Sequence, residues 1–144
     1  MKMINWQLNL MNLISFTDAV RWNFGGTSEK SGYQPRNLIL QLIGHVPVQE
    51  QPQYEVIASN LRPELGKPYY VAVSVNVDDT SETGVRFYMK DLSNPASPLQ
   101  AAFVKHKVVG GYRPNLGVVI GDRDGSRRAR WNGLIDNVRI SRTA

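Results

Sequence analysis

The chain has 144 residues, 42% of them hydrophobic and 20% charged, with a formal net charge of +5 at pH 7. This size and composition fit one globular domain covering residues 1–144, and they exclude the disordered and fibrous classes of protein. No apolar run approaches the ~20 residues that span a bilayer, so membrane insertion is not expected. The absence of cysteine excludes disulfides and thiolate metal sites.

Short strands are predicted along almost the whole chain. Residues 3–14 fit either a weak amphipathic helix or, with the alternation at residues 6–10, a strand, and we favour the strand. The other segments of strand character, bounded by Gly, Pro, Asn or Asp, are residues 19–24, 37–43, 54–59, 69–77, 85–90, 102–107, 116–121 and 134–141. We therefore predict an all-β fold, an antiparallel β-sandwich, with helix below about 15% of residues.

The strongest periodic signal predicts a β-hairpin with one wet face. Valines alternate with small or polar residues over residues 69–77, a polar turn follows at residues 78–84, and residues 85–90 alternate again. The pattern predicts buried side chains for Val71, Val73 and Val75 and solvent-facing side chains for Arg86 and Lys90. In the second strand Val85, Phe87 and Met89 alternate with Arg86, Tyr88 and Lys90. The same argument on the last strand predicts that Leu134, Asp136, Val138 and Ile140 point inward together.

Catalytic signatures are absent from the sequence. No Gly-x-Ser-x-Gly elbow occurs, and residues 25–31 resemble a phosphate loop only in their final Lys-Ser. His45 and His106, the only histidines, lack metal-ligand spacing, and we expect both at strand ends on the surface. No acidic pair has the spacing of a sandwich glycosidase, and the adjacent Asp78 and Asp79 fit a turn. We therefore predict that the chain is not an enzyme and needs no cofactor.

Two candidate sites lie in the C-terminal part, where residues 105–144 hold nine basic and three acidic residues. Asp122 and Asp124 precede a glycine and are candidate calcium ligands, although such a turn needs no metal. A solvated loop is the simpler interpretation of the basic excess, and an anion-binding surface is the functional one. Aromatic residues along the chain are candidates for stacking on sugars or bases, or for ordinary core filling: Trp6, Trp22, Tyr33, Tyr69, Tyr70, Tyr112 and Trp131. The candidate ligand-binding residues are Tyr112, Arg123, Arg127, Arg128, Arg130 and Trp131.

The C-terminal half carries a family resemblance. Residues 67–75 and 85–89, the Gly117–Gly121 segment, and Arg-Trp-Asn-Gly-Leu-Ile-Asp-Asn-Val-Arg-Ile-Ser at residues 130–141 resemble the laminin-G-like jelly roll of the concanavalin A-like lectin/glucanase superfamily. The chain departs from the family pattern at Tyr70, where a histidine is usual, at Trp131, where a phenylalanine is usual, and at residues 89–91.

The resemblance implies a non-catalytic module of a larger exported, periplasmic or cell-surface protein that binds carbohydrate or a protein partner. It gives Gly133 and Asp136 structural roles, and because Asp136 is expected to be buried, it should accept hydrogen bonds. Binding of polyanions or nucleic acid through residues 123–130 is the less favoured alternative, and a glycosidase on the same fold is the least favoured.

The resemblance also implies that the first strands of the family are missing before residue 22. An incomplete sheet leaves an open edge, and open edges recruit partners. We therefore expect a homo-oligomer, formed through the N-terminal segment at residues 4–14 or through an open sheet edge.

Overall fold

The computed structural model describes residues 11–16, 22–27, 34–44, 46, 53–109, 118–121 and 133–140. These residues form strands and no helix, so the predicted all-β fold class is confirmed for the described part of the chain. The eight strands are β1 (Met11–Phe16), β2 (Trp22–Gly26), β3 (Leu38–Gly44), β4 (Gln53–Ala58), β5 (Tyr69–Val75), β6 (Val85–Asp91), β7 (Gln100–Val104) and β8 (Val118–Ile120).

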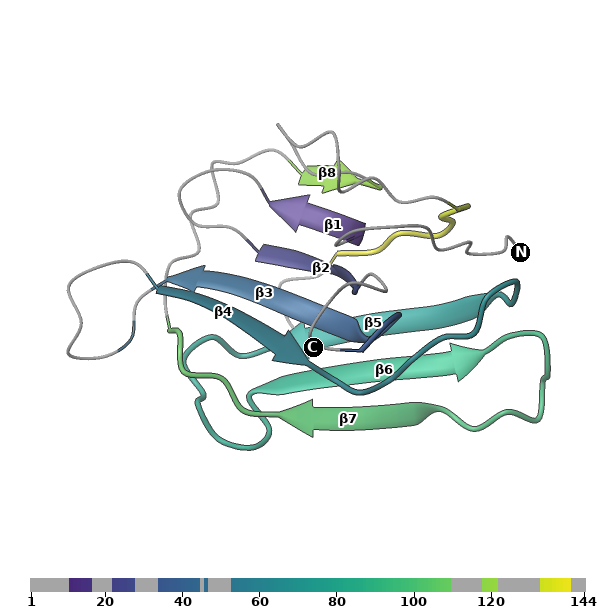
Figure 1. Ribbon diagram of the computed structural model, residues 1–144. Helices are drawn as coiled ribbons and strands as arrows, with labels where there is room; N and C mark the ends of the chain where they lie inside the picture. Colours follow the sequence, from purple (N-terminus) through teal and green to yellow (C-terminus); the bar gives the residue numbers. More distant parts are fainter. Residues whose placement is uncertain are drawn as a thin grey trace.

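The strands form two antiparallel sheets (Figure 1). One sheet has five strands in the order β4-β3-β2-β1-β8, and the other has three in the order β5-β6-β7. Residues 11–16 lie inside the larger sheet, because β1 pairs with β2 on one side and β8 on the other. This part of the N-terminal segment is therefore paired within its own chain. Oligomerisation through an edge stays a prediction, which light scattering over a dilution series can test.

One hydrophobic core joins the two sheets and makes the arrangement sandwich-like. The rings of Phe24 on β2 and Phe87 on β6 lie with their centroids 6.4 Å apart. The alternate residues of β3 and β6 supply most of the fully buried apolar side chains, because alternate residues of a strand point to the same face. The buried cluster consists of Phe24, Leu38, Leu40, Leu42, Ile57, Val85, Phe87, Met89 and Val108.

The predicted hairpin is confirmed in β5 and β6. These strands pair from Tyr69 opposite Asp91 to Val75 opposite Val85. In the turn, the Asp79 amide donates to the Asn76 carbonyl at 3.1 Å, as expected of a turn aspartate. The valines of β5 are half-buried and pack against the core. Arg86 is exposed as predicted, whereas Lys90 is half-buried.

The segment after β7 crosses from the small sheet to the large one and corrects one prediction. His106 is 2% exposed, not a surface residue. Its Nδ1 lies 2.7 Å from the Val108 carbonyl and its Nε2 lies 2.9 Å from the Asn76 carbonyl. A carboxylate oxygen of Glu55, on β4, accepts the backbone N–H groups of residues 107 and 108 at 2.8 and 2.9 Å. The histidine therefore ties the β5–β6 turn to the crossing segment.

A buried polar cluster holds the loops beside β3. The backbone N–H of Asn37 donates to Thr27 Oγ1 at 3.0 Å, and the backbone N–H of Asn60 donates to the side-chain oxygen Oδ1 of Asn37 at 2.8 Å. The backbone takes positive φ at Gln34, Arg36 and Asn60, a region that is uncommon for residues other than glycine. Side-chain acceptors therefore satisfy backbone groups that the sheet ladders leave unpaired.

The C-terminal segment corrects a second prediction. Residues 134–140 form no strand, and Leu134 and Ile140 are 51% and 53% exposed, so their predicted burial is wrong. Val138 and Asp136 are exposed as well, and Asp136 accepts only the neighbouring Asn137 amide, at 2.9 Å, among the described residues. Ile135 packs against the core instead. Alternation does not predict the buried side chains of this segment, because no strand ladder holds its backbone.

Candidate functional site

Most residues that the sequence singled out lie outside the described residues. This applies to the aromatic candidates Tyr112 and Trp131, and to the candidate ligands at residues 122–124, 127, 128 and 130. Of the two residues given structural roles, Gly133 is exposed, and Asp136 is exposed rather than buried. In the described ranges, no group of three or more histidine, cysteine or acidic side chains is arranged to hold a metal ion.

The described part of the chain presents a different candidate, which we call the outer sheet face. It is the side of the β5-β6-β7 sheet (Figure 1) that points away from the shared core. Strand alternation places every second residue there, since the residues between them pack into the core. The outer sheet face consists of Tyr70, Ala72 and Ser74 of β5, Arg86, Tyr88 and Lys90 of β6, and Ala101 and Phe103 of β7.

The register arranges these side chains in three rows across the sheet. Tyr70 is opposite Lys90 in the first row, and Arg86 lies between Ser74 and Phe103 in the third. In the middle row Tyr88 lies between two alanines, at positions 72 and 101. The three aromatic residues therefore follow a diagonal, and diagonal neighbours on a sheet are ~7–8 Å apart.

The aromatic residues on this face are accessible. Tyr70 is 50% exposed and Phe103 is 56% exposed, whereas Phe87 on the opposite face of the same sheet is fully buried. Tyr88 is half-buried, and its two flanking alanines add little height to the surface. Each exposed aromatic ring offers a flat apolar face, so this surface suits a ligand that itself has a flat apolar side.

The outer sheet face carries positive charge and no acidic residue. Arg86 and Lys90 flank Tyr88 along β6, and their Cα atoms are about 13 Å apart at ~3.3 Å per residue of strand. Arg86 Nε donates to the Thr83 carbonyl at 3.3 Å. The three ion pairs among the described residues involve only Lys67 and Lys105 as cations, so neither Arg86 nor Lys90 is paired with a carboxylate there.

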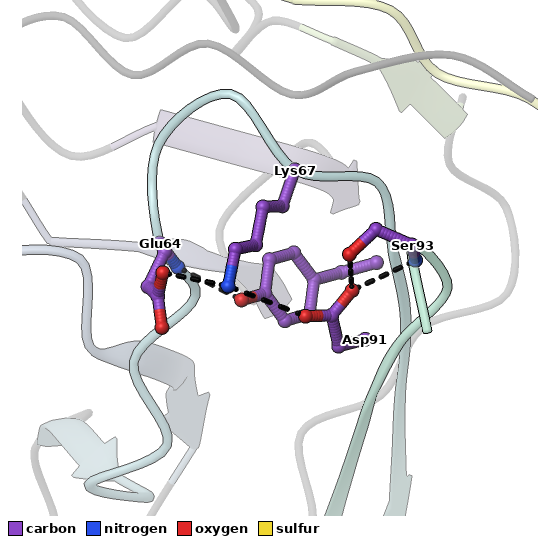
Figure 2. Close-up of polar contacts among 5 residues, drawn as sticks. Glu64, Lys67, Asp91 and Ser93 are labelled. Carbon is purple, nitrogen blue, oxygen red and sulfur yellow. Dashed lines mark hydrogen bonds and ion pairs between the residues drawn. The ribbon is translucent and has the colours of Figure 1, made fainter. Parts of the chain in front are cut away.

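A charged cluster lies at one end of this sheet, where β5 begins and β6 ends (Figure 2). The Lys67 ammonium lies 2.8 Å from a Glu64 carboxylate oxygen and 3.5 Å from an Asp91 oxygen. The Ser93 hydroxyl donates to Asp91 at 2.5 Å, and the Ser93 amide donates to the same oxygen at 2.8 Å. The Tyr69 hydroxyl accepts the Glu64 amide at 3.2 Å.

Two pKa values are shifted in this cluster, in which Lys67 is paired with both Glu64 and Asp91. The hydrogen bond to Glu64 raises the pKa of the Lys67 ammonium above its usual value. The hydrogen bond from the Ser93 hydroxyl, with Lys67 nearby, lowers the pKa of the Asp91 carboxyl. A general acid for glycoside cleavage needs a raised carboxyl pKa, so Asp91 has the opposite property. The cluster fixes the loops that border the outer sheet face.

Sequence reasoning found only part of the outer sheet face. Alternation placed Arg86, Tyr88 and Lys90 on a wet face, and Tyr70 was among the aromatic residues weighed as stacking candidates or core filling. Phe103 gave no signal, because its place beside Arg86 depends on the register between β6 and β7. Register between strands joined by long loops is a tertiary property.

Comparisons of this chain with family models, with curated proteins and with solved structures give no match. Among the described residues, no helix is long and apolar enough to cross a membrane.

Proposed function

We propose that this chain is a non-catalytic binding module of the laminin-G-like jelly-roll type, and that it binds carbohydrate on the outer sheet face. The observation that carries the proposal is the diagonal of Tyr70, Tyr88 and Phe103 across one solvent-facing sheet surface. The C–H side of a pyranose ring is flat and apolar, so it can cover an aromatic ring while its hydroxyl groups stay in water.

A rigid scaffold supports this function. Core side chains hold the sheet from behind, with Val85, Phe87 and Met89 of β6 almost fully buried. The rings on the exposed side therefore keep their spacing without a ligand, which reduces the entropic cost of binding.

The size of the face favours a glycan over a protein partner. It has eight side chains, whereas a stable protein–protein interface uses roughly 20–30 residues and ~800 Å² on each side. A few sugar rings match the smaller area.

Affinity electrophoresis of the full chain through gels containing soluble polysaccharides, neutral and acidic, tests the proposal. We expect retardation by at least one glycan, and loss of retardation in Tyr88→Ala and Phe103→Ala. Tyr54→Ala is the matched control, because Tyr54 is also 56% exposed but lies on β4 of the other sheet. Equal retardation of all the variants, or none for the native chain, would contradict the proposal.

A further inference from the structure

The charges on the outer sheet face allow a narrower statement about the ligand. We infer that the preferred glycan is acidic, carrying carboxylate or sulfate groups, with one ring over Tyr88 and its acidic groups directed to Arg86 and Lys90. This inference rests on the proposed function, because it assigns a ligand class to the same face.

The two cations of the outer sheet face, Arg86 and Lys90, are available to a ligand. Neither forms an ion pair with a carboxylate of the described residues: Asp91 pairs with Lys67, and Glu82 pairs with Lys105 at 3.1 Å. The hydrogen bonds from Ser81, and to a smaller extent the charge of Arg86, lower the pKa of the Asp79 carboxyl, which lies in the turn beside the sheet and accepts the Ser81 amide at 2.9 Å. The eight side chains of the face include no acid. Positive charge on a binding surface whose own side chains include no acid favours an anionic ligand.

The two charged residues lie on either side of Tyr88 along β6. Arg86 and Lys90 are each two residues from Tyr88, so both Cα atoms lie about 7 Å from that of Tyr88 on the same strand face. The guanidinium and the ammonium can reach acidic groups on both sides of a ring that covers the tyrosine. An extended acidic glycan presents such groups at intervals along its length, whereas a neutral glycan leaves both cations without a partner.

Single-stranded nucleic acid also combines flat rings with negative charge, so it has to be distinguished from an acidic glycan as a ligand. Nucleic-acid channels use a positively charged groove that follows the phosphates. Here only two cations lie on the face, both on β6, with small or uncharged neighbours at Ala72, Ser74 and Ala101. The surface therefore suits a polymer of lower charge density.

The test measures binding of the immobilised full chain to oligogalacturonate, dextran sulfate, neutral dextran and oligo(dT). The first two separate carboxylate from sulfate recognition. The key variant is Arg86→Gln with Lys90→Gln. Its matched control is Arg62→Gln with Lys107→Gln, which removes the same two charges from exposed residues. Arg62 bonds to the Pro35 carbonyl and residue 107 bonds through its backbone to Glu55, so both control sites lie off the outer sheet face.

We expect the native chain to bind at least one of the two acidic glycans more tightly than dextran or oligo(dT). Loss of two surface charge contacts should weaken acidic-glycan binding about tenfold in the key variant, and raised salt should weaken native binding in the same direction. The control variant should bind like the native chain.

Four results would overturn the inference. Equal effects of the key and control variants would show that the two cations are not the recognition groups. Tighter binding of dextran would reject the acidic class but leave the proposed function intact, provided that Tyr88→Ala abolishes it. Tighter binding of oligo(dT) would assign the face to nucleic acid, and absence of all glycan binding would overturn the proposed function together with the inference.

Discussion

Two phenylalanines on neighbouring strands of the small sheet provide a test of which face points inward. Phe87 on β6 is fully buried, whereas Phe103 on β7 is 56% exposed. Truncation of a buried phenylalanine to alanine costs about 3–5 kcal/mol through lost burial and the cavity left behind. Truncation at an exposed position usually changes the free energy of unfolding by no more than about 0.5 kcal/mol. The same substitution should therefore differ by at least about 2.5 kcal/mol between the two sites.

Urea denaturation followed by circular dichroism measures this difference. A domain of this size has a total stability of about 5–15 kcal/mol, so Phe87→Ala removes a large part of it. With an m-value of about 1–3 kcal/mol per molar urea, its midpoint should fall by at least about 1 M. The midpoint of Phe103→Ala should stay close to that of the native chain, with an unchanged m-value. If Phe87→Ala does not fold, Phe87→Leu should lower the midpoint by a smaller amount.

The comparison of Phe87 with Phe103 also bears on the candidate site. Equal losses of stability would show that Phe103 packs inside the protein, and the outer sheet face would then not exist as described. A loss confined to Phe103 would show that the sheet is turned the other way. Only a loss of stability confined to Phe87→Ala agrees with the observed packing, in which Phe87 contacts Phe24 across the core.

The remaining predictions concern contacts that hold the loops at the ends of the two sheets. Gly84→Ala should destabilise the chain by about 1–3 kcal/mol in urea, because the new Cβ would lie 1.9 Å from the Asp79 carbonyl oxygen. Glu55→Ala should cost about 1–3 kcal/mol by leaving two backbone donors without their acceptor, whereas Glu55→Gln should keep most of the stability; equal losses would reject this role. The Ser93 hydroxyl holds the Asp91 pKa below its ordinary value of 3.8, so Asp91 stabilises the fold above that value and the contribution is lost as the pH falls through the lower folded-state pKa. Asp91→Asn should flatten the acid limb of stability measured between about pH 2 and pH 6, and an unchanged limb would contradict the shift.

The local sequence pattern alone was enough to predict the strands in which apolar residues recur with a clear period of two. The hairpin of β5 and β6 has the predicted inward residues, because alternation, a polar turn and flanking valines all act over short stretches of chain. Strand ends were less well predicted, since β7 stops at Val104 whereas the predicted strand extends to residue 107. Beyond Val104 the backbone turns to bury His106, and a lone histidine carries no periodic signal.

The sequence by itself determined the fold class, the wet and dry faces of β5 and β6, and the turn at Asp79, because these depend on neighbours within a few residues. Tertiary structure alone decided that Leu134 and Ile140 are exposed, that β1 pairs with β8, and that Phe103 shares a face with Tyr88. The β1–β8 pairing and the place of Phe103 depend on the register between strands, whereas Leu134 and Ile140 are exposed because their segment joins no strand ladder. Register is set by the packing of the whole core, and a shift of one residue exchanges the two faces of a strand.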